Sequence, residues 1–186
     1  MKKVSIAEQR TTLYGVWEWI RRTKRSYSLE LAQVRSSLVS GTAVDADYVG
    51  MTVGDLEGEF ASRGGELDEA GAFFIVAEAE ALLRTDFLRR VYRREKDDLS
   101  RRFRAMHREA STRVRLEDHI LAAWRDEVPS ARAEIGEFAG LTNYRNWLAH
   151  GRYWVKKHGR NYDADSSLEI VENLFSALPS RDGWRL

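Results

Sequence analysis

The sequence contains no cysteine and only two prolines, Pro129 and Pro179. Without cysteine the chain forms neither a disulfide framework nor a cysteine-ligated zinc site, and this composition fits a cytoplasmic protein. No apolar run reaches the roughly 18 residues that a membrane-spanning helix needs, so we expect no membrane segment. No apolar stretch follows the N-terminal lysines, which argues against a signal peptide. Because proline breaks helices from within, its scarcity favours long helices.

The short motifs of several large enzyme classes are also missing. The sequence has no P-loop, no dinucleotide-binding glycine fingerprint and no serine in a G-x-S-x-G elbow. Its four histidines show no HExxH spacing. The acidic pairs Asp45-Ala-Asp47 and Asp163-Ala-Asp165 are more typical of solvated loops than of a cation site. We therefore expect neither a metal site nor another cofactor.

What is present is apolar patterning with helical spacing, which predicts an all-α fold with no strands and no internal repeat. A chain of 186 residues is long enough to bury a core as one domain. We expect residues 67–178 to form the core of an antiparallel bundle, with residues 1–66 as an N-terminal helical extension packed on it. Helices are predicted over residues 5–22, 28–39, 52–63 and 67–94, from 97 or 98 to 110, and over residues 116–127, 131–139, 141–150 and 165–178. Their expected ends include capping patterns at Ser5 and Thr52, the glycine pair Gly64-Gly65, a cap at Ser130 and a stop or bend at Gly140.

Charge is strongly segregated, although the net charge is only +1. From Asp45 to Glu80 ten acids accompany one base, and from Arg84 to Arg115 twelve bases accompany five acids. An arginine-rich segment of this kind can contact the phosphates of a nucleic acid. The candidates for such contacts are Arg101, Arg102 and Arg104. The alternative is a solvated helix face whose bases pair with the acidic segment.

Residues 141–154 are the segment in which chemistry is expected, because Arg145 and Asn146 precede His150 at close spacing. Histidine is the side chain suited to proton transfer near neutral pH, and arginine is a permanent cation. On a helix, Asn146 and His150 are i,i+4 neighbours that project away from an apolar stripe of leucine and tyrosine. Arg145 and His150 point about 140° apart, at about 100° per residue. Arg145 must therefore wrap around the helix to share a ligand with His150, or a second subunit must complete the site.

Glu80 interrupts an apolar stripe on the helix predicted for residues 67–94. A carboxylate in such a stripe is costly unless it is paired. In a structural role, Glu80 forms an ion pair or extends to the rim of the core. In a functional role, it serves as an additional acid in a site. The apolar residues of the stripe are Phe73, Val76, Leu83, Phe87 and Val91.

The pattern Arg145-Asn146-Trp-Leu-Ala-His150 resembles the HEPN superfamily. Nucleases of that superfamily carry an arginine, four to six arbitrary residues and a histidine, very often with asparagine directly after the arginine. The resemblance implies a HEPN-like antiparallel helical bundle, here with extra N-terminal helices. It also implies metal-independent cleavage of RNA to a 2′,3′-cyclic phosphate, at a cleft between two copies of the motif in a homodimer. Nucleases of the superfamily often have an additional polar or acidic residue on an upstream helix near the arginine and histidine, and Glu80 is a candidate for it.

On this interpretation the chain is an endoribonuclease of bacterial defence or toxin–antitoxin type, with RNA as substrate and an antitoxin protein as a further partner. His150 transfers the proton of the 2′-hydroxyl, while Arg145 neutralises charge on the phosphoryl oxygens. Asn146 holds the imidazole or the phosphate by hydrogen bonds. Arg152 contacts phosphate and Tyr153 stacks on a base.

Three alternatives stay open. Arg145 can pair structurally with an acid such as Glu137, with His150 as the C-cap of its helix. The chain can instead be a non-catalytic helical module that binds RNA or a protein through residues 84–115. A third alternative is a small-nucleotide sensor that uses an Arg145 pocket.

Overall fold

The computed structural model describes residues 11–151, 160–180, 183–184 and 186, and all regular structure within them is helical. The predicted all-α fold is therefore confirmed. None of the helices in these ranges is long and apolar enough to cross a bilayer. The α-helices are α1 (Leu13–Ser40), α2 (Val53–Arg93), α3 (Asp98–Ala110), α4 (Ala122–Glu127), α5 (Arg132–Ala149) and α6 (Ala164–Ala177). Shorter helical turns are η1 (Ala46–Tyr48), η2 (Ser111–Arg113), η3 (Leu116–Leu121) and η4 (Pro129–Ala131).

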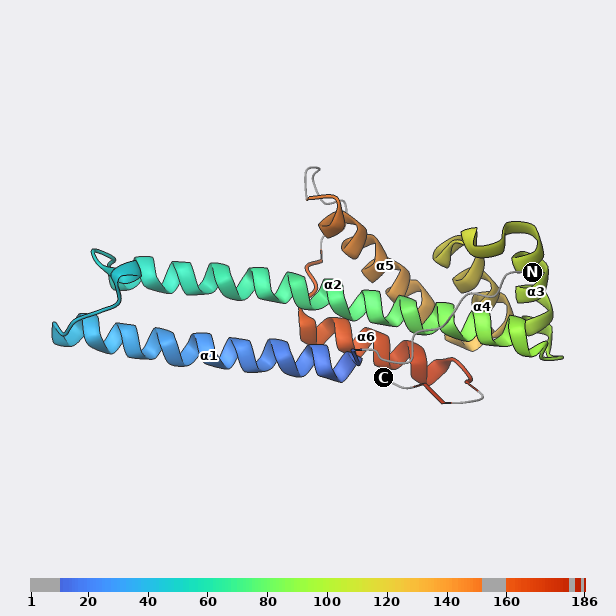
Figure 1. The fold of residues 1–186 in the computed structure, drawn as a ribbon, viewed down its shortest axis with the longest axis horizontal. Helices are drawn as coiled ribbons and strands as arrows, with labels where there is room; N and C mark the ends of the chain where they lie inside the picture. Colours follow the sequence, from blue (N-terminus) through green and yellow to red (C-terminus); the bar gives the residue numbers. More distant parts are fainter. Residues whose placement is uncertain (1–10, 152–159, 181–182, 185) are drawn as a thin grey trace.

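The helix α2 has 41 residues and extends through the whole molecule (Figure 1). It begins at the predicted capping box: the Thr52 hydroxyl accepts from the Asp55 amide at 3.2 Å, and the Asp55 carboxylate accepts from the Thr52 amide at 3.0 Å. The predicted break at Gly64-Gly65 is wrong, because the helix continues through both glycines. Each glycine costs a helix about 1 kcal/mol. Phe60 and Leu67, one turn to either side, are buried and offset this cost.

The helix α1 is also continuous, although two helices were predicted for this part of the chain. Its N-cap is Thr12, and the predicted cap at Ser5 lies outside the described residues. The polar middle of α1 stays helical because three hydroxyls bond to carbonyls one turn earlier. Thr23, Ser26 and Ser28 make these bonds at 2.9, 3.2 and 3.0 Å. Hydroxyl groups that could otherwise bond to the backbone in non-helical conformations thus find their hydrogen-bond acceptors within the helix.

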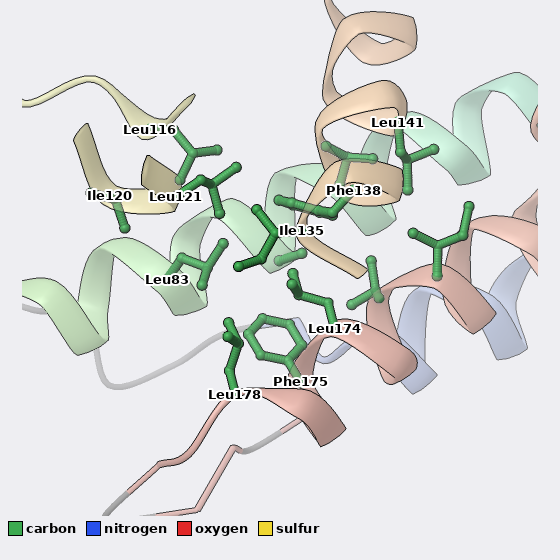
Figure 2. Packing of buried hydrophobic residues seen from close by; sticks show 14 of the residues in the cluster. Leu83, Leu116, Ile120, Leu121, Ile135, Phe138, Leu141, Leu174, Phe175 and Leu178 are labelled. Carbon is green, nitrogen blue, oxygen red and sulfur yellow. The ribbon is translucent and has the colours of Figure 1, made fainter. Parts of the chain in front are cut away.

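Among the described residues, buried apolar side chains form two hydrophobic clusters. The large one, which we call the body core, is surrounded by the second half of α2, α3, η3, α4, α5 and α6, and the first turns of α1 join it. Figure 2 shows part of it, with Leu83, Leu116, Ile120, Leu121, Ile135, Phe138, Leu141, Leu174, Phe175 and Leu178 labelled. The small one, which we call the tip cluster, consists of Val34, Tyr48, Leu56 and Phe60. The helices α1 and α2 lie side by side around the tip cluster (Figure 1), and the turn η1 between them contributes Tyr48.

The remaining helix ends follow the sequence in part. The helix α3 has the predicted bounds, and the predicted helix over residues 116–127 is the π-helical turn η3 followed by α4. Ser130 is not a cap, because α5 begins after the turn η4 without a side-chain cap. Gly140 does not end α5, which continues to Ala149; a Cβ at Gly140 would lie 3.3 Å from the Tyr162 hydroxyl, so the glycine makes room for this side chain. The helix α6 begins at Ala164, and its N-cap Asp163 forms a capping box with Ser166.

Candidate functional site

The predicted site residues Arg145 and Glu80 are in direct contact. Arg145 lies in the C-terminal half of α5, and its Nη2 forms an ion pair with Oε2 of Glu80 in α2, 65 residues earlier. Both side chains are largely buried, with exposed fractions of 23% and 20%. The partner of Arg145 is thus the acid of the apolar stripe rather than Glu137. The stripe residues beside Glu80 are mostly buried, and the pairing compensates for placing a carboxylate there.

A second arginine, Arg84, binds the other oxygen of the same carboxylate. Both Nε and Nη2 of Arg84 lie 2.8 Å from Oε1 of Glu80. Its Nη1 donates to the backbone carbonyl of Val114 at 2.9 Å. Arg84 was not among the predicted site residues, although its i,i+4 spacing from Glu80 favours such a pair on a helix. Glu80 therefore lies between two guanidinium groups, and the three side chains together carry a formal charge of +1.

The Arg145 guanidinium has a further donor that the described residues do not use. Its Nε is buried and has no hydrogen-bond partner among them. An unpaired buried donor costs roughly 1–3 kcal/mol, more when it is charged.

His150 and Asn146 lie at the C-terminal end of α5. His150 is exposed and occupies the C-cap position, where its backbone N–H donates to the Asn146 carbonyl at 3.1 Å. Gly151 follows with φ +78°, a left-handed conformation that ends the helix. This end of α5 points away from the other helices (Figure 1). Arg145 and His150 are separated by about 7 Å along the helix axis, because each residue rises about 1.5 Å.

Within one chain, the structure therefore brings Arg145 to Glu80 and leaves His150 at the exposed helix end. The Arg145 side chain points toward Glu80 on α2. This direction is consistent with the separation of about 140° that was predicted between the side chains of Arg145 and His150. The remaining candidates, Arg152 and Tyr153, lie outside the described residues.

Aromatic rings pack around the same end of α5. Tyr144 stacks on Trp147 with ring centroids 5.7 Å apart and meets Tyr162 at 5.3 Å. Nearer the start of the helix, the Thr142 hydroxyl donates to Glu117 of η3 at 2.8 Å. These contacts fix α5 against η3 and against the segment that leads into α6. Contacts with both η3 and the segment before α6 thus fix the position of the helix that carries the motif.

The arginines predicted to bind nucleic acid are engaged within the protein. Arg101 pairs with Asp98 at 2.7 Å and Arg102 with Asp126 at 2.6 Å. Arg104 donates to the Glu95 backbone carbonyl. All three lie on α3, at the end of the molecule distant from the C-terminal end of α5 (Figure 1).

The predicted pairing of the basic and acidic segments is only partly observed. Arg84 pairs with Glu80 as that alternative required. Other acids of the segment from Asp45 to Glu80 pair with bases of α1 instead: Lys24 contacts Asp68 at 2.6 Å and Arg35 contacts Glu57 at 3.2 Å. Residues 84–115 largely use acids of their own neighbourhood, because Asp86 lies one turn from Arg90 on α2 and Asp98 lies one turn from Arg101 on α3.

A buried arginine, Arg90, anchors the end of α2. It lies 2.7 Å from Asp86 and 3.4 Å from Asp97, and it donates to the Pro179 carbonyl at 3.2 Å. Burial raises the pKa of Asp86 above its usual value, and the Arg90 charge offsets part of this rise. Burial also acts to raise the pKa of Asp97, but donors from Ser100 and the Arg90 charge bring it below the usual value. These contacts join α2, α3 and the segment after α6, which is a structural role.

A groove of about 530 Å³ lies along α1 and contains none of the predicted site residues. It is lined by residues from Ser28 to Ser40. Comparison with known proteins adds no assignment, since no family model, no curated protein and no solved structure matches this chain. Its function must therefore be inferred from its own residues and contacts.

Proposed function

We propose that this chain is a metal-independent endoribonuclease of the HEPN type, in which Arg145 and His150 act on one phosphodiester. The contact between Arg145 and Glu80 carries the proposal. It gives the arginine of the motif an acidic partner on an upstream helix, as the resemblance implies. The exposure of His150 on the same helix as Arg145 adds support, because a proton-transfer group must be reachable by the substrate.

RNA suits these side chains because it carries its own nucleophile. The 2′-hydroxyl gives up its proton to His150 and attacks the adjacent phosphorus, while the bond from phosphorus to the 5′-oxygen breaks. The products are a 2′,3′-cyclic phosphate and a 5′-hydroxyl, which takes up a proton. Arg145 stabilises the negative charge that grows on the phosphoryl oxygens. Asn146, one turn before His150, orients the imidazole or the phosphate by hydrogen bonds.

We propose that two copies of the chain complete the site. Arg145 faces α2, whereas His150 lies at the end of α5, so one chain does not aim both groups at one point. Two copies of α5 related by a twofold axis can place Arg145 of one copy beside His150 of the other. A nuclease of this kind in the cytoplasm needs restraint, and an antitoxin protein that covers the exposed end of α5 would provide it.

The alternative of a non-catalytic nucleic-acid-binding module receives less support. Arg101, Arg102 and Arg104 each already contact an acceptor of the protein, which leaves fewer of their N–H donors for an RNA phosphate. This alternative predicts salt-sensitive binding without cleavage.

Cleavage of single-stranded RNA in the presence of EDTA tests the proposal. We expect the wild-type protein to release fragments with 2′,3′-cyclic phosphate ends. His150→Ala and Arg145→Ala should each slow cleavage by about 10²-fold or more. His119→Ala is the matched control, since this histidine accepts from the Arg115 amide in η3 and should leave the rate unchanged. Circular dichroism verifies that each variant is folded.

Mixing the two inactive variants tests the shared site. A mixed dimer of His150→Ala and Arg145→Ala retains one intact site, so random exchange should restore about one quarter of the activity. Binding of RNA without any product would favour the non-catalytic module. Cleavage that persists in both single variants would exclude Arg145 and His150 as the catalytic pair.

A further inference from the structure

We infer that an exposed strip of α2 is the surface on which a second copy of this chain docks. The inference deepens the proposed function, since it names the interface of the dimer that the shared site requires. It rests on that proposal only for the need of two copies, and association can be measured without RNA cleavage. The strip, which we call the α2 strip, consists of Glu66, Ala70, Phe74, Ala77, Ala81 and Arg84.

The members of the α2 strip share one outward side of the helix. Consecutive members are three or four residues apart, which makes them neighbours on a helix surface. Glu66 and Ala77 are exposed, and the alanines at positions 70 and 81 are partly exposed. The Arg84 side chain is 39% exposed. The strip thus begins with an acid, has an apolar centre and ends with a base.

Aromatic rings form the most prominent part of this surface. Phe74 is 47% exposed and Trp19 of α1 is 48% exposed, and their ring centroids lie 6.2 Å apart. Phe73 extends the group, with its ring centroid 5.8 Å from that of Phe74. Exposed aromatic groups of this kind anchor protein–protein interfaces, because their burial removes a large apolar area from water.

The order of charge along the α2 strip identifies a second copy as the partner. In a twofold antiparallel pair, Glu66 of one copy lies opposite Arg84 of the other, and Phe74 lies opposite the small side chain of Ala77. The same pairing sets the two remaining alanines against each other, which lets the helices approach closely. Because both copies use the same surface, the contact is isologous and closes as a dimer.

The whole of α2 has the same polarity. Residues 53–80 contain eight acids and one base, whereas residues 81–93 contain four bases and one acid. An antiparallel copy places the acidic part of each helix against the basic part of the other, whereas a parallel copy would place like charges together. Arg84 keeps further N–H donors for this contact, since Glu80 and the Val114 carbonyl use only part of its guanidinium. The charge segregation that is visible in the sequence thereby acquires a role in association.

The α2 strip adjoins the helix that carries the motif. Its last member, Arg84, binds Glu80, and Glu80 binds Arg145 of α5. A twofold axis between the two strips lies perpendicular to both copies of α2, so it keeps the two α5 helices on one side of the pair. The shared site requires this arrangement.

Analytical ultracentrifugation of the full chain tests the inference. We expect the wild type to form a dimer, and Phe74→Glu should raise its dissociation constant about 30-fold or more, as the loss of an interface anchor does. Trp19→Ala should raise it about tenfold. Val39→Glu is the matched control, because it changes a side chain at the tip that is apolar and 76% exposed, and it should not affect association. Circular dichroism verifies that each variant is folded.

A reversal of charge tests the electrostatic part of the contact. Glu66→Lys sets a base opposite the basic part of the other α2 and should weaken association about fivefold. Asp47→Lys makes the same change of charge in η1, distant from the α2 strip (Figure 1), and should leave the dissociation constant unchanged.

The absence of cysteine from the sequence allows a test of the orientation. Chains with Ala70→Cys and chains with Ala81→Cys, mixed and oxidised, should form a disulfide-linked pair, since these positions lie opposite each other in the antiparallel dimer. Each variant alone should link poorly, because identical positions are then about 16 Å apart along α2, beyond the roughly 7 Å that a disulfide spans between Cα atoms. A parallel pair would instead link each variant to itself, which would contradict the inference.

The outcomes separate the inference from the proposed function. If Phe74→Glu associates as tightly as Val39→Glu, the α2 strip is not the dimer surface, and cleavage that depends on Arg145 and His150 would still support the nuclease. A wild type that stays monomeric at every accessible concentration would overturn the inference and the shared site together. A dimer that meets these expectations but cleaves no RNA would retain the inference and exclude the nuclease.

Discussion

The body and the tip of this molecule are stabilised in different ways. The body core is built by side chains from every α-helix, including the fully buried Phe103 and Trp124. The tip, where α1 ends and α2 begins, has only the four buried residues of the tip cluster. Burial of apolar area is the main stabilising term in folding, at about 25 cal/mol per Å². The body therefore holds most of the stability, and the tip depends on the helices that continue into it.

Ion pairs are exposed in the tip and more deeply buried in the body. In the tip, Arg35 and Glu57 are 59% and 50% exposed, and such pairs contribute about 0–1 kcal/mol. In the body, the side chain of Arg90 is 7% exposed and binds several acceptors. A buried pair becomes a liability when one partner is removed, because the other charge is left without compensation. Charge therefore sets local geometry in the body and adds little stability in the tip.

The largest expected effect is that of Phe103→Ala in the body core. Phe103 is fully buried and meets Phe87 at 5.0 Å and Trp124 at 6.3 Å between ring centroids. Its truncation should lower the free energy of unfolding by about 3–5 kcal/mol. Urea denaturation followed by circular dichroism measures this loss.

Phe60→Ala is the counterpart in the tip. It should accelerate amide hydrogen exchange in residues 42–62 and leave exchange in α3 and α6 nearly unchanged. An equal loss of protection in both regions would show that the tip and the body unfold as one unit, so that the two regions do not differ in this respect.

An intermediate effect is expected at Gly71, where α1, α2 and α6 cross. A Cβ at this position would lie 2.9 Å from the Ala164 Cβ and 3.1 Å from Ile20 Cγ1. Gly71→Ala should therefore destabilise the protein by about 1–3 kcal/mol, as measured by thermal and urea unfolding. Gly64→Ala is the matched control, because nothing lies within 4 Å of its Cβ position. This control should stabilise α2 by about 0.5–1 kcal/mol, and a loss of stability there would mean that Gly64 has a role beyond its helical backbone.

The smallest effect concerns the two capping boxes, one in each region. Hydrogen bonds from the Ser166 hydroxyl and amide hold the pKa of Asp163 below its usual value. A lowered pKa stabilises the fold above the usual aspartate value of about 3.9, and this contribution is lost as pH falls through the folded pKa. Asp163→Ala should cost about 1 kcal/mol at pH 7, and its difference from the wild type should shrink below pH 4. Unfolding at both pH values measures this, and a difference that does not change with pH would be inconsistent with the cap.

The Asp55 box in the tip provides the comparison for Asp163. The Thr52 hydroxyl and amide hold the pKa of Asp55 below its usual value. Because this cap is solvated, Asp55→Ala should only increase hydrogen exchange in the first turn of α2. A measurable loss of global stability would show that the first turn of α2 is coupled to the body.

The sequence was informative where local chemistry decides the structure. The Thr52–Asp55 box, the bounds of α3 and the all-α class follow from residues close together in the chain. The continuity of α2 through Gly64-Gly65, in contrast, does not follow from residues close together in the chain. A penalty of about 1 kcal/mol per glycine is visible in the sequence, whereas the burial of Phe60 and Leu67 that offsets it exists only in the folded protein.

The candidate site shows the same limit. An acid in the apolar stripe indicated that Glu80 needs a partner, but the choice of Arg145 rather than Glu137 depends on how α5 crosses α2. The pair between Arg84 and Glu80 was missed although its i,i+4 spacing is visible in the sequence, whereas the anchor of Arg84 on the Val114 carbonyl, 30 residues later, is not. The sequence left open whether the arginines of α3 contact phosphates or pair with acids, and the contact of Arg102 with Asp126 on another helix is visible only in the folded protein.

The unbroken course of α2 limits how this chain can be divided. A fragment that starts at residue 67 would begin in mid-helix, without the Thr52–Asp55 cap and without the α1 residue Ile20 that lies against Gly71. Exposed amides and an uncovered apolar face would follow at that new end. Shortening the protein to its C-terminal two thirds would thus destabilise the helix that carries Glu80. Any truncated form prepared for assay should therefore keep α1 and α2 whole.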